Sequence, residues 1–212
     1  SVVALRPTTG EVLAMASTPS ADPAQIVGPP AEQAKENFEN YASDESAPLL
    51  NRSTQQIQPP GSTFKVITTA AALEEGDTPE TSVTAAPQIT LPDTATTLEN
   101  YGGAACGGGG TTTLREAFKR SCNTAFVDIS TRHGADKFKK VSEAFGIGSE
   151  DDYLGLPVEP SRLGEIPDGA ALGQSSIGQR DVALTPLQNA VIAATVANGG
   201  VRMKPYLSLI HI

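Results

Sequence analysis

The most informative absences in this sequence concern aromatic residues, basic charge and long apolar runs. Trp is absent from the 212 residues and only 5% are aromatic, so we expect an aliphatic core. Lys and Arg number 15 against 24 Asp and Glu, a formal net charge of −9, which argues against a nucleic-acid partner or an anionic membrane surface. No apolar run reaches the roughly 18 residues of a membrane span, and no signal segment opens the chain.

Cysteine and histidine are scarce, which limits the metal and redox chemistry available. The two cysteines, Cys106 and Cys122, are 16 positions apart. Their number leaves one disulfide or two free thiols open, and their spacing matches no zinc site. His133 precedes Gly134 at the expected end of a helix, and we interpret it as a helix-end residue and not a catalytic base. No metal or cofactor is expected.

What is present is a domain-sized mixture of strand-like and helical segments, rich in Gly and Pro. Val2–Leu5 and Glu11–Ala16 predict two strands joined by a turn at Pro7–Gly10. Because this strand pattern starts at the first residues, we expect the chain to begin inside a domain, downstream of any targeting segment. Ser17–Gln58 is polar and is predicted to form a long surface excursion.

Helices account for most of the remaining predicted structure. Pro59-Pro60-Gly61 ends the excursion, and the apolar residues of Ser62–Glu75 cover most of a helix surface, as in a buried helix. A further helix is predicted to begin at the capping box of Thr113 and Glu116 and to end near Arg120, and the next one runs from there to His133. Two more helices are predicted over Asp136–Phe145 and Pro186–Asn198, the second behind a capping box of Thr185 and Gln188. The segment 77–110 has short strand-like pieces and a glycine-rich loop that lacks the features of a phosphate-binding loop. Together these predict one α+β domain.

Ser62-Thr63-Phe64-Lys65 has the clearest chemical meaning. Three residues of helix bring Lys65 onto the same face as Ser62. A serine hydroxyl is a poor nucleophile at neutral pH and needs a base, and burial lowers the pKa of a lysine toward the neutral form that can serve as one. The start of a helix also offers unpaired N–H groups to a developing oxyanion. A capping serine and a surface lysine are the alternative from these residues alone.

A second polar pair, Ser121 and Asn123, stands in the predicted break between two helices. Two positions apart in such a break, both side chains can project to one side. The hydroxyl suits relay of a proton to a leaving amine, and the carboxamide suits holding a substrate amide or orienting the lysine. Capping of the next helix is the alternative explanation of both residues.

Four stretches together resemble a known family, the class B penicillin-binding proteins. Gln58–Val66, with its Pro-Gly before the serine, looks like their first active-site box, and Ser121–Phe126 resembles the second. Val3–Ser17 is similar to the opening hairpin of their transpeptidase domain. The segment that leads to their third box is similar to this sequence in Ser176–Gln179, Thr185–Gln188 and Ala197–Gly200. The resemblance covers nearly the whole chain, with its markers in the family order.

The resemblance implies a β-lactamase/transpeptidase-like α+β fold, a helical body packed on an antiparallel sheet of which only the N-terminal hairpin is clear here. It implies that Ser62 is the acylated nucleophile, Lys65 its base, and Ser121 and Asn123 the proton relay and substrate-binding pair. The expected enzyme is a bacterial peptidoglycan D,D-transpeptidase, serving cell division or cell shape, that acts on stem peptides and is acylated by β-lactams. Membrane-bound wall-synthesis partners and an extracytoplasmic position, anchored through an upstream segment, are expected as well.

One element of the family pattern is missing, because no Lys-Thr-Gly or Lys-Ser-Gly occurs in the sequence. We therefore interpret residues 1–212 as a partial transpeptidase domain without its C-terminal strands, and 207–212 as a tail that departs from the family pattern. The missing strand supplies an oxyanion donor worth about 2.7–4 kcal/mol in the barrier, so this chain alone is expected to be a poor acyltransferase. The unpaired hairpin edge is expected to lower its stability.

Two other functions share parts of this pattern. A serine β-lactamase has the first box, but it needs machinery that activates a deacylating water. A β-lactam sensor or a non-catalytic scaffold domain also keeps the Ser-x-x-Lys box. The lifetime of the acyl-enzyme separates a lactamase from a transpeptidase, and complementation by a Ser62→Ala protein would favour the scaffold. A disulfide between Cys106 and Cys122 is compatible with work outside the cytoplasm, where disulfides persist.

Overall fold

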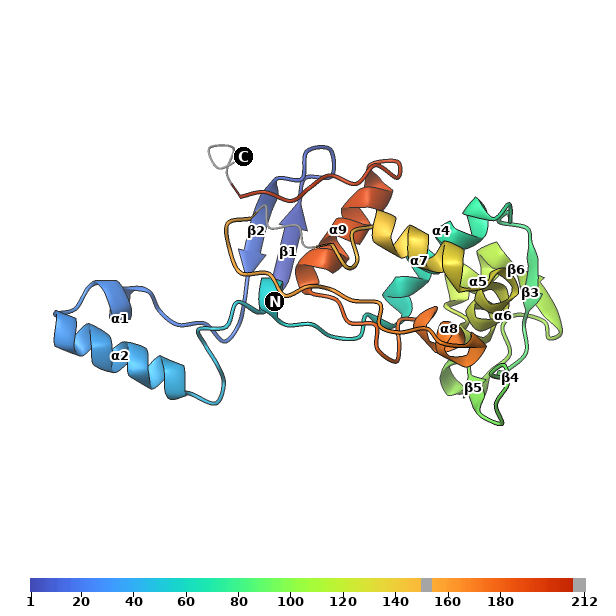
Figure 1. Ribbon diagram of the computed structural model, residues 1–212, viewed down its shortest axis with the longest axis horizontal. Helices are drawn as coiled ribbons and strands as arrows, with labels where there is room; N and C mark the ends of the chain where they lie inside the picture. The colour runs from blue at the N-terminus through green and yellow to red at the C-terminus, as the bar shows by residue number, and fades with distance from the viewer. Residues whose placement is uncertain (150–153, 208–212) are drawn as a thin grey trace. The chain divides into compact units, whose positions relative to one another are not determined.

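The computed structural model describes residues 1–149 and 154–207 (Figure 1). These residues form two compact units. Unit 1 contains residues 1–57, 154–159 and 185–207, and unit 2 contains residues 58–149 and 160–184. From residue 208 onward, the predicted C-terminal tail lies outside the described residues. All four residues predicted to carry chemistry belong to unit 2.

The N-terminal hairpin of unit 1 forms as predicted. β1 (Val2–Leu5) pairs antiparallel with β2 (Val12–Ala16), with Val2 opposite Ala16 and a register shift near the turn. The alternation of small and branched apolar residues suits a pleated pair of strands. The second strand begins one residue later than predicted.

The turn of this hairpin depends on a glycine. Gly10 N donates to Arg6 O at 2.9 Å. Gly10 has a φ of +86°, and a Cβ at this position would lie 2.1 Å from Lys204 O, so only glycine allows the later segment to approach so closely. The same segment pairs through Tyr206, which forms a parallel bridge with Glu11. The loop after the last helix is therefore tied to the hairpin turn.

The polar segment after the hairpin lies mostly at the surface, as predicted, but it is more helical than the sequence pattern indicated. It contains α1 (Ala24–Val27), α2 (Ala31–Ser43) and α3 (Arg52–Gln55). No residue of α2 is buried, although Ala34, Phe38 and Tyr41 recur at helical spacing, a signal that the prediction of a surface excursion did not use. The segment is anchored at its end, where Ser53 and Thr54 are fully buried.

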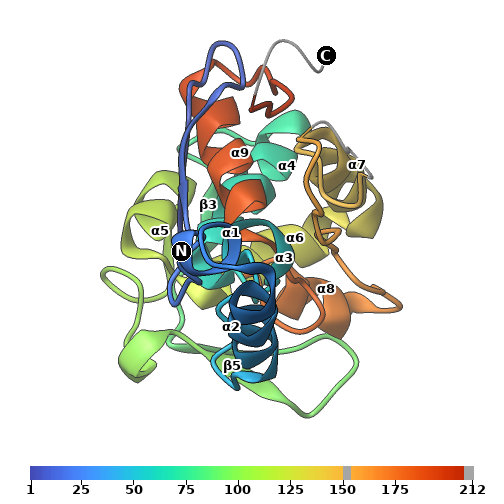
Figure 2. The ribbon, with the colours of Figure 1, turned by 90° about the vertical axis from the view of Figure 1, so that its left-hand side faces the viewer.

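The last helix of unit 1, α9 (Pro186–Ala197), packs against β1 and α3 (Figures 1 and 2). Its start is as predicted, because Thr185 accepts a hydrogen bond from Gln188 N at 3.0 Å and Pro186 occupies the first turn. Asn198 is the C-cap and not the last helical residue.

Unit 2 is built around α6 (Asn123–His133). This helix contacts α4 (Lys65–Glu74), α5 (Leu114–Arg120), α7 (Ala135–Ala144) and α8 (Gly169–Ser175). Most of its length is buried, and Phe126 and Ile129 have no exposed surface. The predicted helices that became α5, α6 and α7 are confirmed to within about a residue at each end.

Short antiparallel strand pairs complete unit 2. β3 (Ser82–Thr84) pairs with β6 (Thr111–Thr113), and β4 (Gln88–Thr90) pairs with β5 (Thr97–Glu99). Helix α6 also contacts β3, β4 and β5. With the hairpin of unit 1, the described residues hold three two-stranded antiparallel sheets, which together with the helices confirm the α+β class.

The helix predicted over Ser62–Glu75 needs two corrections. The α-helix begins at Lys65, and a tighter 3-10 helix, Gly61–Phe64, precedes it. Leu73 was counted among the apolar residues of a buried helix, but it is 45% exposed near the C-terminal end. Burial is concentrated on Phe64, Ile67 and Ala71, which lie one turn apart.

Helix α8 was not predicted. Its sequence, Gly-Ala-Ala-Leu-Gly-Gln-Ser, contains two glycines, each of which disfavours a helix by roughly 1 kcal/mol relative to alanine. Packing explains one of them, because a Cβ on Gly173 would lie 3.0 Å from Val127 Cγ1 and 3.2 Å from Leu91 Cδ2. The glycine that weakens the helix in isolation thus lets it approach α6 closely.

Candidate active site

The site begins at the turn that presents Ser62. Gly61 has a φ of +57°, which favours glycine, and it opens the 3-10 helix directly after the two prolines. Thr63 Oγ1 donates to Pro60 O at 2.9 Å and closes the turn. Phe64 points the other way, fully buried with its ring 5.9 Å from that of Phe138. The turn therefore leaves Ser62 exposed, while the buried Phe64 anchors the backbone of the turn.

Lys65 is buried beneath this serine. Its side chain is 1% exposed, and its Nζ lies 3.2 Å from Ser62 Oγ. Burial lowers the pKa of Lys65 from its ordinary value of 10.5 to about 8. The ring of Phe126, whose centroid is 5.5 Å from Nζ, attracts the charged form, but desolvation outweighs it. The alternative of a surface lysine is excluded by this burial.

Ser121 and Asn123 come to the same amine from the break between α5 and α6. Lys65 Nζ lies 2.7 Å from Ser121 O, 3.1 Å from Ser121 Oγ and 2.7 Å from Asn123 Oδ1. Ser121 has a φ of +57° and a ψ of +45°, a left-handed conformation that costs a non-glycine residue about 1 kcal/mol. All four residues predicted from the sequence are thus brought together in one cluster.

The orientation of Asn123 is fixed from its other end. Its Nδ2 donates to Glu99 O at 2.9 Å, so its Oδ1 faces the lysine. Both ends of the carboxamide are engaged within unit 2. Of the two roles considered for this residue, the geometry favours orientation of the lysine over capture of a substrate amide.

The contacts of Lys65 decide what a neutral amine would do here. Ser121 O and Asn123 Oδ1 can only accept hydrogen bonds, because neither oxygen carries a proton. The two N–H groups of a neutral amine are used by these two oxygens, and its lone pair is left for the hydroxyls of Ser62 and Ser121. Neutral Lys65 can therefore accept a proton from a hydroxyl without giving up either fixed contact.

A loop behind the serine turn supports it, which the sequence pattern did not reveal. Gly61 N donates to Gly178 O at 3.0 Å, and Thr68 Oγ1 donates to Ser176 O at 2.6 Å. Gly178 has a φ of +71°, and a Cβ on it would lie 2.2 Å from Gly61 O. The glycine within the stretch Ser176–Gln179 was the available signal, because such close contact and positive φ both require glycine.

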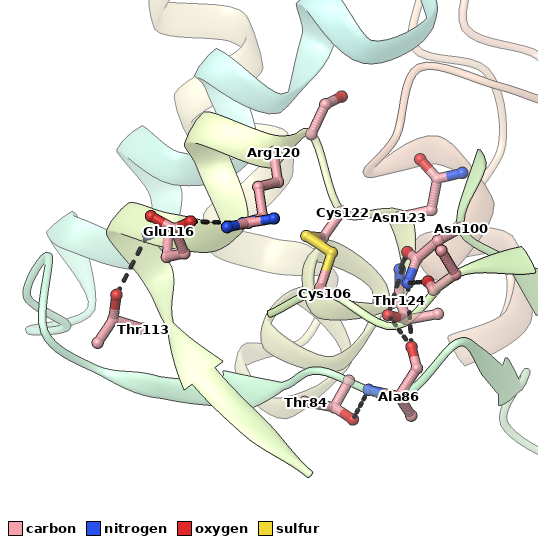
Figure 3. The surroundings of a disulfide bond; sticks show 12 residues. Thr84, Ala86, Asn100, Cys106, Thr113, Glu116, Arg120, Cys122, Asn123 and Thr124 are labelled. Carbon is pink, nitrogen blue, oxygen red and sulfur yellow. Dashed lines mark hydrogen bonds and ion pairs between the residues drawn. A yellow bond between two sulfur atoms is a disulfide. The ribbon is translucent and has the colours of Figure 1, made fainter. Parts of the chain in front are cut away.

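A disulfide lies directly beside the second polar pair. Cys106 and Cys122 are joined, which resolves the choice between one disulfide and two free thiols (Figure 3). Cys122 stands between Ser121 and Asn123 in the sequence and is 1% exposed. The bond ties the glycine-rich loop to the break that carries both site residues.

Asn100 connects the segment before the glycine-rich loop to α6. Its Oδ1 accepts from Thr124 N at 3.1 Å and from Thr124 Oγ1 at 3.2 Å (Figure 3). Its Nδ2 donates to Ala86 O and Ala104 O, both at 3.0 Å. Because Asn100 follows Glu99, this network also positions the carbonyl that orients Asn123. No sequence signal identified Asn100.

His133 lies at the C-terminal end of α6, as predicted. Its Nε2 is 2.5 Å from Asp77 Oδ2, and the pair joins the ends of α6 and α4. Within the described residues, Ser62 Oγ is hydrogen-bonded to Lys65 and not to a histidine. In the same residues no group of His, Cys, Asp and Glu side chains is arranged to hold a metal ion. None of the described helices has the length and apolarity needed to cross a membrane.

Comparison with known proteins places this geometry among related chains. The family described as the penicillin binding protein transpeptidase domain matches residues 1–209. The peptidoglycan D,D-transpeptidase PbpA of Mycolicibacterium smegmatis is 54% identical over 207 residues, which are 98% of this chain and 42% of that protein. This chain thus spans about two-fifths of the length of that curated relative.

Solved structures agree with this match. The penicillin G acyl-enzyme complex of penicillin-binding protein A from M. tuberculosis has a TM-score of 0.93 at 53% sequence identity, covering 97% of this chain and 47% of that one. A peptidoglycan synthase complex that coordinates polymerization and crosslinking contains a chain with a TM-score of 0.84 at 34% identity, covering 97% of this chain and 36% of that one.

Proposed function

We propose, since this chain belongs to the family of penicillin-binding protein transpeptidase domains, that it carries the acylation site of a peptidoglycan D,D-transpeptidase. The transpeptidase-like α+β fold that the sequence predicted is confirmed by the solved relatives. One observation carries the proposal: Lys65 Nζ, in a side chain that is 1% exposed, lies 3.2 Å from the oxygen of the exposed Ser62.

The proposed reaction has two halves. In the first, Ser62 Oγ attacks the carbonyl carbon between the two D-Ala residues of a stem peptide, and Lys65 takes the hydroxyl proton. The C–N bond then breaks, and the proton passes through the Ser121 hydroxyl to the leaving D-Ala amine. In the second half, an amine of a neighbouring stem peptide attacks the ester carbonyl and gives up a proton to Lys65. Lys65 returns this proton to the Ser62 oxygen as the ester bond breaks, which restores the serine hydroxyl and the neutral amine.

Each residue has a distinct part in this scheme. Neutral Lys65 supplies the base, and its lowered pKa supports that role. Asn123 holds the amine, and Ser121 stands close enough to pass on its proton. The N–H of Gly61, at the start of the serine turn, is taken by Gly178 O, so we propose that the next N–H, that of Ser62, serves a developing oxyanion.

The wider setting of the reaction is proposed on the same basis. We place the domain on the extracytoplasmic face of a bacterial membrane, anchored by a segment outside this chain. The disulfide supports this placement, because disulfides persist in oxidising compartments. Membrane-bound wall-synthesis partners are proposed from the similarity to a chain of a synthase complex. A role in division or shape, and the extent of the domain over 1–212, stay predictions.

The test is covalent labelling followed by peptide mass spectrometry. Incubation of the full-length protein that carries this domain with benzylpenicillin is expected to add one penicilloyl group, located on Ser62, and Ser62→Ala is expected to remove it. Thr63→Ala serves as a matched control, because it deletes the adjacent exposed hydroxyl and is expected to keep the adduct on Ser62. An adduct elsewhere, or none on the unaltered protein, would contradict the proposal.

The lifetime of this adduct separates the remaining enzyme classes. A transpeptidase is expected to hold the penicilloyl ester for far longer than it takes to form, whereas rapid release of hydrolysed penicillin would indicate a β-lactamase. A scaffold role predicts that Ser62→Ala in the full-length protein still supports growth. We expect that variant to fail.

A further inference from the structure

We propose that Gln179 is a substrate-positioning residue, whose carboxamide pairs with a peptide unit of the acyl-donor stem peptide. The inference rests on the proposed function and deepens it. It assigns a role to the exposed side chain of the Ser176–Gln179 stretch, whose other residues are buried.

The position of Gln179 is tightly determined by its backbone. Gln179 N donates to Gln174 O at 3.2 Å, and the preceding residue, Gly178, accepts from Gly61 N at 3.0 Å. No side chain fits between Gly178 and Gly61, because a Cβ on Gly178 would lie 2.2 Å from Gly61 O. Gln179 therefore leaves the backbone immediately beside the turn that carries Ser62.

The side chain of Gln179 extends along that turn. Its Nε2 lies 3.7 Å from the point where a Cβ on Gly61 would stand, so the amide is in van der Waals range of the residue before the nucleophile. Both Gln179 and Ser62 are exposed. From this position beside Gly61, the amide is placed to contact a peptide bound at the exposed Ser62.

The chemistry of the group matches such a peptide. Over the ranges 1–149 and 154–207, the Gln179 carboxamide has no hydrogen-bond partner, unlike that of Asn123, which is engaged at both ends. A free carboxamide presents an acceptor oxygen and a donor NH₂ in one plane, the complement of a backbone C=O and N–H. It is also neutral, so it can bind a peptide unit without changing the charge around Lys65.

The experiment uses two probes that separate Ser62 reactivity from peptide recognition. 6-Aminopenicillanic acid has no exocyclic amide, and its rate of acylation measures the reactivity of Ser62. Diacetylated Lys-D-Ala-D-Ala is the peptide probe, and the concentration that halves this acylation rate measures its binding. Both readings are taken on the unaltered protein and on Gln179→Ala and Gln179→Leu, of which the second keeps the size of the side chain.

The expected result is a binding effect without a reactivity effect. In both variants, the half-inhibiting peptide concentration should rise by about five- to tenfold, the loss of one or two neutral hydrogen bonds. The rate with 6-aminopenicillanic acid, its pH midpoint and the melting temperature should stay unchanged. Gln174→Ala is the control for local disturbance of the loop, and it should leave both readings as they are.

Three results would overturn the inference. The first is unchanged peptide inhibition in Gln179→Ala, and the second is an equal shift in Gln174→Ala. The third is a 6-aminopenicillanic acid rate that falls in parallel with peptide binding, which would indicate support of the serine turn and not contact with the peptide. If the unaltered protein forms no adduct on Ser62 at all, the proposed function fails, and this inference fails with it.

Discussion

Replacement of Asn123 by Asp would test directly whether the amine of Lys65 works in its neutral form. The substitution puts a carboxylate where a carbonyl oxygen now lies 2.7 Å from Lys65 Nζ. An opposite charge at such a distance shifts a pKa by about 1–3 units toward the charged form. Lys65 starts from a pKa of about 8, so we expect the substitution to raise its pKa to between about 9 and 11.

The shift in pKa translates into a rate. A base with a pKa of about 8 is neutral in roughly one molecule in ten at pH 7, and in roughly one in a hundred when its pKa is about 9. Acylation at pH 7 should therefore fall by about tenfold or more in Asn123→Asp. It should recover as the pH rises through the new pKa, because deprotonation restores the base.

The assay is the rate of acylation by a fluorescent penicillin, measured from about pH 6 to about pH 10. Asn123→Ala is the control, since it removes the oxygen contact without adding a charge. It should slow acylation without moving the midpoint to higher pH. The reasoning is refuted if the midpoint of Asn123→Asp does not lie above that of the unaltered protein.

Three further sets of substitutions follow from the site geometry. Gly178→Ala forces a Cβ to within 2.2 Å of Gly61 O. We therefore expect a lower melting temperature and an acylation rate reduced more than tenfold. Normal values of both would contradict the close contact. Ser121→Ala and Ser121→Gly both delete the proposed relay and should slow transfer by about a hundredfold. In denaturant unfolding, Ser121→Gly should be about 1 kcal/mol more stable than Ser121→Ala, because glycine relieves the left-handed strain. Full activity of the Gly variant would rule out the relay. Cys106→Ser with Cys122→Ser opens a loop of sequence separation 16 and should lower the free energy of unfolding by about 3 kcal/mol, and equal stability would show that the disulfide adds nothing.

The chemistry of the site was predictable where it depends on local periodicity. The spacing of Ser62 and Lys65 places both on one face whether the turn is 3-10 or α-helical, so the error in the helix start did not matter. Ser121 and Asn123 were predictable because a helix break leaves neighbouring polar side chains free to point the same way. Orientation of the lysine by Asn123 was one of two roles inferred from the residues, and the family resemblance added the role of Ser121 and Asn123 as a pair in one active site.

The supporting parts of the site were not predictable, because they rest on long-range backbone contacts. Asn123 is oriented by the carbonyl of Glu99, and any residue type at that position supplies a carbonyl. Gly178 supports the serine turn from 117 positions away along the chain, a separation over which local patterns carry no information. Tertiary packing of this kind also explains why the glycine-containing α8 forms against its intrinsic propensity.

Surface helices were missed for a different physical reason. Helix α2 buries no residue, although its apolar residues Ala34, Phe38 and Tyr41 recur at helical spacing. The Pro, Asn and other polar residues of the segment around it favoured a loop, and this apolar spacing was passed over.

The most direct test of the account is a titration of the Lys65 side chain itself. Heteronuclear NMR of the amine nitrogen and its neighbouring carbon follows protonation of each lysine, and a spectrum of Lys65→Arg identifies the signal. The account predicts a midpoint near the pKa of about 8 that burial produces. A midpoint at the ordinary value of 10.5 would mean that the amine stays charged at neutral pH, and it would contradict the role of Lys65 as the base that activates Ser62.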